Sequence, residues 1–196
     1  MLKEDRRSMP LNQDIIGPYF KTMPQGKSVI KSEDVASSMD LRFITEDQAE
    51  EMSSFIRPMW VDLYTVLNDC DREFIEKRSE NWIGADLIRE RIRSGFFYAY
   101  VIDNGSTVGM MAGGVSGEDM IVSKVYILPE FRGKGYGHEC VRYMLDYGRE
   151  HGCKKAVLEV NPKNYSAMDM YRELGFVETG KIQYERGYTI IMSYDY

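Results

Sequence analysis

The sequence is short of cysteine and has no long apolar run. Its three cysteines, Cys70, Cys140 and Cys153, show no C-x-x-C spacing, and an odd number cannot all pair. We therefore expect reduced thiols and no metal site. No segment approaches the roughly 20 apolar residues that cross a bilayer. The charged start, MLKEDRRSMP, is not followed by the apolar stretch of a secretory signal. These absences predict a cytoplasmic protein with no membrane partner.

An excess of positive charge is also missing. The 25 Lys and Arg residues are outnumbered by 31 Asp and Glu residues, which gives a net charge of −6. Nucleic-acid binders normally present a basic face, so no nucleic-acid partner is expected. An acidic surface is compatible with a cationic substrate such as an amine. The 196 residues are enough for one domain with a full core and an appendage.

Residues 1–38 form an irregular extension in this interpretation. They hold Pro10, Pro18 and Pro24 among mostly polar neighbours, without a sustained period of two or 3.6. We expect this segment to be flexible or draped over the surface. Its apolar patch, residues 15–20, could dock on a second copy, so a homodimer is among the expectations. Residues 39–196 form the second unit.

The order of elements in residues 39–196 predicts a mixed sheet with helices on its faces, the α+β (mixed α/β) class. Thr45 and Gln48 form a capping box that starts a helix, and one or two more helices follow within residues 60–93. Asn104-Gly105 is a strong hairpin turn between two strands. Later helices are expected over residues 138–151 and before Gly175, and strands over residues 41–45, 96–102, 108–115, 120–128, 155–160 and 188–194.

A glycine-rich segment lies between a strand and a helix. It reads R-x-x-G-x-G, as Arg132-Gly133-Lys134-Gly135-Tyr136-Gly137. Glycine tolerates positive φ and close approach of a ligand, and the first N–H groups of a helix attract anions. The two basic side chains add positive charge. The spacing fits neither the nucleotide P-loop nor the dinucleotide fingerprint. A ligand-free tight turn is the structural alternative.

The segment resembles the GNAT superfamily of acetyltransferases, whose hallmark is R/Q-x-x-G-x-G/A after a strand that ends near a proline, here Pro129. A second hallmark follows at the expected distance, as Asn164, Ala167, Tyr171 and Gly175-Phe176. The resemblance covers about residues 39–196. It implies a GNAT-like central sheet, mixed and mostly antiparallel, flanked by helices. It also implies an N-acetyltransferase that uses acetyl-CoA and acts on a primary amine of a small molecule or peptide.

The resemblance also assigns roles to residues. The backbone of Val125 and Ile127 would pair with the pantetheine arm of coenzyme A, and Asn164 would contact that arm from the other side. The pyrophosphate would be bound by Arg132 and by the N–H groups of Gly133, Lys134, Gly135, Tyr136, Gly137 and His138. Two structural alternatives remain open. Asn164 could do no more than cap its helix, and Lys134 could simply be exposed to solvent.

Tyr171 would lie near the sulfur, where its hydroxyl can protonate the departing thiolate. As part of the apolar stripe of its helix, it could equally be a core residue. Many family members carry a glutamate in the middle of the strand before the glycine loop, but this chain has Ile121-Val122-Ser123 there. Glu118, Glu159 or a chain of waters are the candidates for the base that deprotonates the amine.

Other mechanisms and functions are compatible with the same two motifs. Transfer through an acetylated cysteine is possible chemistry, but no His lies near Cys140 or Cys153 in a plausible pair, so direct transfer is preferred. A sensor that binds CoA or acyl-CoA without turnover, or a transferase of a longer acyl group, would share the motifs. Substrate identity should depend on residues 46–93, whose aromatic and basic residues give no readable code.

Overall fold

A computed structural model describes residues 39–184 and 187–196; the expected extension and its apolar patch lie outside the described residues. The helices are α2 (Ala49–Asn68), α3 (Arg72–Ile83), α4 (Ala85–Arg93), α5 (Tyr136–Glu150) and α6 (Tyr165–Glu173), with 3₁₀ turns η2 (Glu46–Gln48) and η3 (Pro129–Phe131). The strands are β1 (Met39–Phe43), β2 (Phe97–Asp103), β3 (Ser106–Ser116), β4 (Asp119–Ile127), β5 (Lys155–Val160), β6 (Val177–Tyr184) and β7 (Gly187–Asp195).

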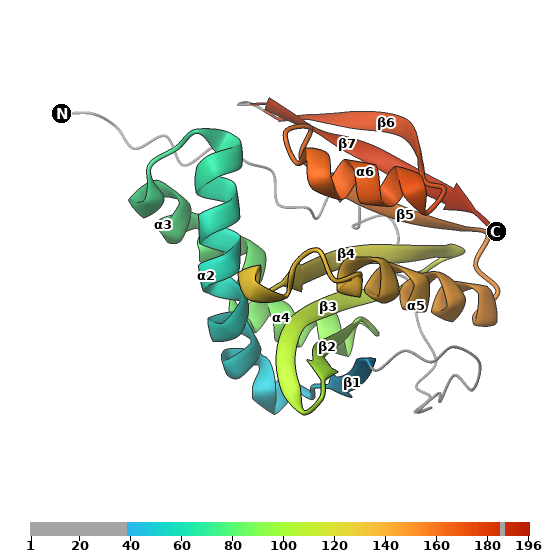
Figure 1. Cartoon of the computed structure of the whole chain (residues 1–196), viewed down its shortest axis with the longest axis horizontal. Helices are drawn as coiled ribbons and strands as arrows, with labels where there is room; N and C mark the ends of the chain where they lie inside the picture. Colours follow the sequence, from blue (N-terminus) through green and yellow to red (C-terminus); the bar gives the residue numbers. More distant parts are fainter. Residues whose placement is uncertain (1–38, 185–186) are drawn as a thin grey trace.

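The seven strands form one sheet in the order β1-β2-β3-β4-β5-β7-β6. Every neighbouring pair is antiparallel except β4 and β5, which are parallel. That parallel pairing covers only Asp119–Ile121 against Lys155–Val157. Beyond it the two strands separate, as Figure 1 shows on the side away from the C-terminus. The predicted mixed, mostly antiparallel sheet is confirmed, and its centre is open.

Helices cover both faces of the sheet. One core cluster joins α5, β5 and α6 through buried residues such as Val141, Leu158 and Met168. The other joins α2, α3 and α4 to β2 and β3, with Ile56 and Ile88 fully buried. In Figure 1, α5 and α6 lie in front of the strands, whereas α4 is fainter and lies behind them. The amphipathic helix predicted over residues 138–151 buries its apolar side in the first cluster, as expected.

A bulge in β4 changes which side chains face each side of the sheet. Ala112 of β3 pairs with Lys124, but the next residue, Gly113, pairs with Val122, so Ser123 is left without a partner. Before the bulge, Val122 packs in the cluster beneath α5; after it, Val125 packs there instead. The alternation along the strand has therefore shifted by one residue. Lys124 consequently faces the opposite side, toward α2 and α3.

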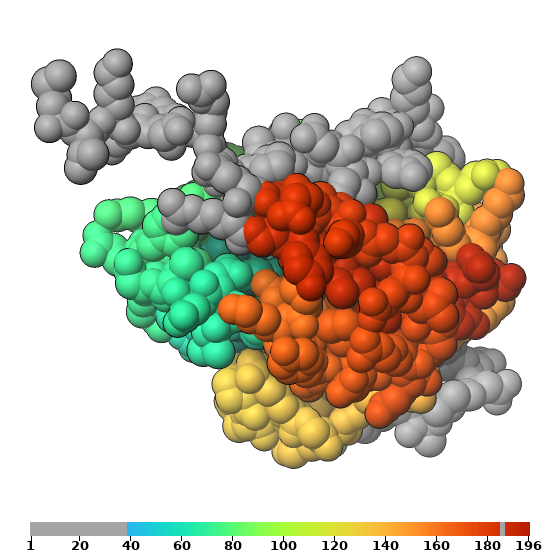
Figure 2. Space-filling view, turned by 90° about the horizontal axis from the view of Figure 1, so that it is seen from above, coloured from blue at the N-terminus to red at the C-terminus, as the bar shows by residue number. Residues whose placement is uncertain are grey.

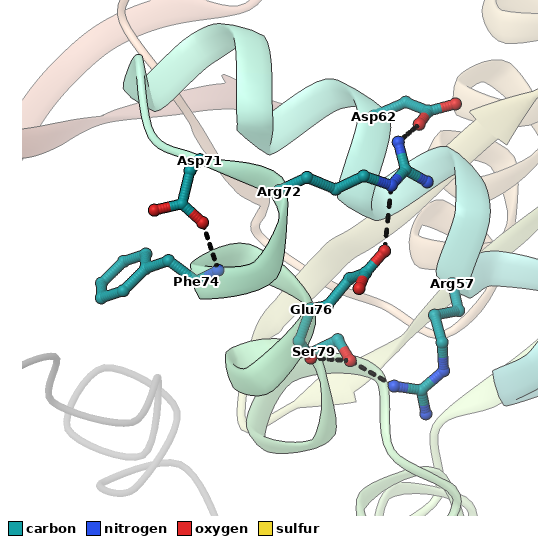
Figure 3. A network of polar contacts seen from close by, with 7 residues as sticks. All are labelled: Arg57, Asp62, Asp71, Arg72, Phe74, Glu76 and Ser79. Carbon is teal, nitrogen blue, oxygen red and sulfur yellow. Dashed lines mark hydrogen bonds and ion pairs between the residues drawn. The ribbon is translucent and has the colours of Figure 1, made fainter.

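Polar contacts fix α3 against α2 (Figure 3). Arg72 Nη1 donates to Asp62 Oδ1 of α2 at 2.6 Å, and Arg72 Nε donates to Glu76 Oε1 at 2.9 Å. Nearer the other end of α3, Arg57 of α2 donates to the buried Ser79 hydroxyl. These contacts hold in place the two helices that form one wall of the cavity described below.

The sequence-based boundaries needed two corrections in the fold. The helix that starts after the Thr45–Gln48 capping box, in which Thr45 N–H donates to Gln48 Oε1 at 3.2 Å, is continuous to Asn68 rather than followed by a separate helix from residue 60. Pro58 is exposed within it, and removal of one helical N–H does not break a helix whose apolar side is buried along its length. The strand β6 was not predicted, because its side chains are mostly exposed and show little apolar alternation.

Candidate active site

The separated ends of β4 and β5 border a cavity of about 620 Å³. Its lining comes from α2 and α3, from β4 and β5, and from the β6–β7 hairpin. Figure 2 shows the C-terminal strands, in red, next to α2 and α3, in teal and green, on the same face of the molecule. The wall is rich in aromatic side chains: Trp60, Tyr64, Phe74, Trp82, Tyr126, Tyr184 and Tyr188.

One candidate base, Glu159 of β5, lines this cavity. Its Oε2 accepts hydrogen bonds from Tyr184 Oη and Thr189 Oγ1, each at 3.3 Å. Burial raises the pKa of the Glu159 carboxyl, and the two hydrogen bonds and the nearby cations Arg91 and Lys124 partly oppose this rise. A carboxylate with a raised pKa accepts protons more readily near neutral pH than an exposed one.

The other candidate, Glu118, lies at the surface. Its side chain is 68% exposed and its Oε1 pairs with Lys154 Nζ at 2.7 Å. Glu118 is not among the residues that line the cavity. The structure thus separates two carboxylates that the sequence alone could not tell apart.

A lysine that sequence reasoning missed also lines the cavity. Lys124 follows the β4 bulge and its side chain is half-buried. Burial, reinforced by the positive charge of Arg91, lowers the pKa of its amine to about 8. One feature of the sequence could have pointed to Lys124. It is the single charged residue in the mostly apolar strand Met120–Leu128, at the point where the alternation of inward and outward side chains breaks.

The candidate acid Tyr171 belongs to α6. It packs against the cluster beneath α5, with its ring 5.8 Å from that of Phe176. Burial raises the pKa of its phenol, and interactions with Tyr64 of α2 and Cys140 of α5 raise it further. These partners belong to opposite faces of the sheet, so Tyr171 interacts electrostatically with both. The Tyr64 pKa is likewise raised to about 12 by burial, with Glu159 as the second cause. Both phenols are therefore protonated at neutral pH and can donate a proton.

The predicted anion loop has the expected backbone. Gly133 and Gly135 adopt φ values of 74° and 91°, and a Cβ at either position would meet no atom within 4 Å. Gly135 is the N-cap of α5 and offers no side-chain acceptor to the helix. The first N–H groups of α5 therefore stay available to an anion. Arg132 is exposed beside them, and its Nε donates to Ile127 O at 3.0 Å.

The remaining side chains of the loop have protein partners. Lys134 Nζ lies 5.0 Å from the centre of the Phe131 ring, and Tyr136 Oη donates to Asp103 Oδ2 at 2.8 Å. His138 Nε2 lies 2.9 Å from Glu173 Oε2 of α6. A Cβ on Gly137 would lie 2.9 Å from Met170 Sδ, so glycine also permits the close approach of α5 and α6. These contacts leave the backbone N–H groups of the loop and the exposed Arg132 as the groups best suited to an anion.

The residues assigned to the pantetheine arm belong to two elements, strand β4 and the N-cap of α6. Val125 and Ile127 belong to the part of β4 that has no strand partner toward β5 within the described residues. Asn164 caps α6, because its Oδ1 accepts from Ala167 N–H at 3.4 Å. The capping alternative is thus confirmed, and it leaves the Asn164 amide nitrogen for another contact.

The cysteines are poorly suited to nucleophilic catalysis. Cys140 is fully buried, and burial raises the pKa of its thiol to about 12. Burial also raises the pKa of Cys153. The thiolate is the reactive form, and neither thiol forms it readily near neutral pH. These surroundings favour direct transfer over a covalent acetyl-cysteine.

The family described as acetyltransferase (GNAT) family matches residues 60–176, which include the open strands, the anion loop and α6. The chain belongs to the GNAT acetyltransferase family. The predicted family, fold and enzyme class, an acyltransferase, are confirmed.

A relative from Methanocaldococcus jannaschii, an uncharacterized N-acetyltransferase, is 29% identical over 175 residues, 85% of this chain and 71% of the relative. The thialysine N-epsilon-acetyltransferase of Bos taurus is 32% identical over 59 residues, 30% of this chain and 35% of the relative. The match therefore spans about a third of the bovine protein.

Solved GNAT structures share the fold. An N-acetyltransferase of Thermoplasma acidophilum in complex with coenzyme A superposes with a TM-score of 0.69, at 16% identity, and covers 82% of this chain and 100% of its own. An acetyltransferase of Salmonella typhimurium with its cofactor acetyl-CoA gives a TM-score of 0.57 at 18% identity, covering 81% of this chain and 94% of its own.

Two further observations concern other kinds of site. Within residues 39–184 and 187–196, no group of three or more His, Cys, Asp or Glu side chains is placed to hold a metal ion. None of the helices in those ranges combines the length and the apolarity that crossing a bilayer requires.

Proposed function

We propose that this enzyme transfers the acetyl group of acetyl-CoA directly to a primary amine of a small molecule or peptide, and that residues 39–196 form the catalytic domain. One observation carries the proposal: β4, which separates from β5 beyond Ile121, lines a cavity that contains Glu159 and leads along the chain into the uncapped N-terminus of α5. A donor with an anionic arm would bind on the side of the α5 N-terminus, and an amine would bind in the cavity.

The residues present fit coenzyme A. The N–H groups at the start of α5, with Arg132, would hold its pyrophosphate, since a glycine N-cap leaves them without an internal acceptor. The edge of β4 at Val125 and Ile127, which has no strand partner toward β5 within the described residues, would bond the pantetheine amides as an added strand does. The Asn164 amide would contact the arm from the α6 side. Bound there, the cofactor supplies the activated acetyl group.

Glu159 and Tyr171 would divide the proton transfers. An alkylamine with a pKa of about 10.4 must lose a proton before it attacks. Glu159 lies in the cavity with a raised pKa and would accept that proton, directly or through water. Tyr171 keeps its own proton at neutral pH and would give it to the departing sulfur. Glu118 is the weaker candidate, because it is exposed and paired with Lys154.

Tyr171→Phe tests this function against a sensor that binds without turnover. The phenyl ring keeps the packing on Phe176, whereas the lost hydroxyl acts only as charge develops on sulfur. We expect kcat to fall by about 10²-fold or more, with acetyl-CoA affinity near wild type.

Tyr143→Phe is the matched control. Tyr143 of α5 is also half-buried and in contact with aromatic rings, but it lies in the cluster with Phe97 and Tyr147, away from the point where β4 and β5 separate. Its loss should alter only stability, by about 1 kcal/mol. Equal kcat values for the two variants would remove Tyr171 from the mechanism, and no turnover by the wild type across a broad amine panel would favour the sensor.

A further inference from the structure

A lysine of the protein itself lines the cavity proposed for the acceptor. Lys124 follows the bulge at Ser123, so its side chain faces α2 and α3, whereas the adjacent Val125 faces the cluster beneath α5. Val125 is also one of the two residues proposed to pair with the pantetheine arm. The Lys124 amine therefore belongs to the strand that would hold the donor, and it enters the space from which an external amine would attack.

The surroundings of Lys124 leave its amine available as a nucleophile. Within the described residues its Nζ makes no hydrogen bond and no ion pair at 4.0 Å or less; its electrostatic neighbours are Arg91 of α4 and Glu159 of β5. Tyr64 of α2, Arg78 of α3 and Tyr184 of β6 also line the cavity. A carboxylate in contact would hold the lysine charged, but the cavity provides no such contact.

The protonation state of Lys124 also supports a role for its amine as a nucleophile. Burial and the charge of Arg91 lower its pKa from 10.5 to about 8. At pH 8 about half of such amines are neutral, against roughly 0.3% of amines with the ordinary pKa, a difference of about 150-fold in nucleophile. A structural lysine normally stays charged and solvated or paired, whereas Lys124 is half-buried and has no ion-pair partner within the described residues.

We propose that Lys124 is an internal acceptor, which the enzyme acetylates from its own bound acetyl-CoA when no external amine fills the cavity. This inference rests on the proposed function. The neutral Nζ attacks the thioester carbonyl, the N–C bond forms and the C–S bond breaks. The proton released by the amine ends on the departing sulfur, so the products are Nε-acetyl-lysine and free coenzyme A, with no other reactant.

Acetylation of Lys124 would limit the enzyme. The acetamide has no titratable amine and projects into a cavity of about 620 Å³, where it resembles a bound product. It would also remove the positive charge beside Glu159. Modified molecules should therefore turn over an external amine more slowly, and an external acceptor at high concentration should protect Lys124.

The test is site-resolved mass spectrometry of the full chain incubated at pH 8 with acetyl-CoA that carries heavy isotopes in its acetyl group, without an acceptor. Lys154 and Lys163 are matched controls, since both are exposed and Lys163 borders the same cavity. We expect heavy acetyl on Lys124 to accumulate at least tenfold faster than on either control. The rate per molecule should not change on tenfold dilution of the protein. Arg132→Glu, which should weaken the donor site, should suppress labelling of Lys124 but not of the controls.

Several outcomes would overturn the inference. Labelling of Lys124 no faster than Lys154, or equal labelling in Arg132→Glu, would mean chemical acetylation only. If the same preparation acetylates an external amine while Lys124 stays unlabelled, the inference fails and the proposed function stands. If it does neither and does not bind acetyl-CoA, both fail.

Discussion

Lys124→Met should stabilise the protein near neutral pH. The half-buried Lys124 amine has a folded-state pKa of about 8 against an ordinary value of 10.5. At 1.36 kcal/mol per tenfold change in proton affinity, the protonated amine lowers the free energy of unfolding by about 3 kcal/mol. Methionine has a similar length and carries no charge, so it removes this cost and keeps the contacts of the side-chain stem.

The sign of the pH dependence follows from the direction of the shift. Below pH 8 the lysine is protonated in both the folded and the unfolded chain, so the full cost is present. Between pH 8 and 10.5 the unfolded chain binds more protons, so the wild type gains stability as pH rises. Above 10.5 the cost is gone. The advantage of Lys124→Met should therefore be greatest at pH 7 and small at pH 10.

Thermal and urea unfolding at both pH values would measure this difference. A gain of about 3 kcal/mol corresponds to roughly 6–12 °C in Tm for a chain of this size. Lys163→Met is the control, because that lysine is exposed and its replacement should change stability little at either pH. The reasoning is refuted if Lys124→Met is no more stable than the wild type at pH 7, or if its advantage is the same at pH 10.

The other predictions concern the base and the anion loop. Glu159→Gln should lower kcat at least tenfold more than Glu118→Gln, because only Glu159 lines the cavity; equal losses in steady-state assays would contradict this assignment. Gly135→Val should weaken acetyl-CoA binding at least tenfold, about 1.4 kcal/mol, by calorimetry, because a β-branched residue cannot keep the φ of 91° that opens the loop. Gly152→Val imposes similar strain at the other end of α5, with φ of 71° and open surroundings, and should leave affinity unchanged; a similar loss of affinity in both variants would mean that destabilisation alone explains it.

The sequence by itself determined the features that depend on local chemistry. The anion loop is readable because positive φ selects glycine and because helix N-termini attract anions wherever they occur. Gly133 and Gly135 have that backbone in the structure. The order of strands and helices, with the two family motifs, was likewise enough for the fold and the enzyme class, which the comparisons confirm.

Only the tertiary structure decided which polar side chains share the cavity. Glu118 lies in the turn before β4 and Glu159 lies within β5, and the burial of Glu159 arises from packing by segments distant in sequence, such as Tyr184 and Thr189. Lys124 faces the cavity because Ser123 has no partner on β3, a matter of register between two strands. Register and burial are collective properties of the whole sheet. The local sequence of β4 specifies a strand, but the strands around it decide which of its side chains meet the substrate.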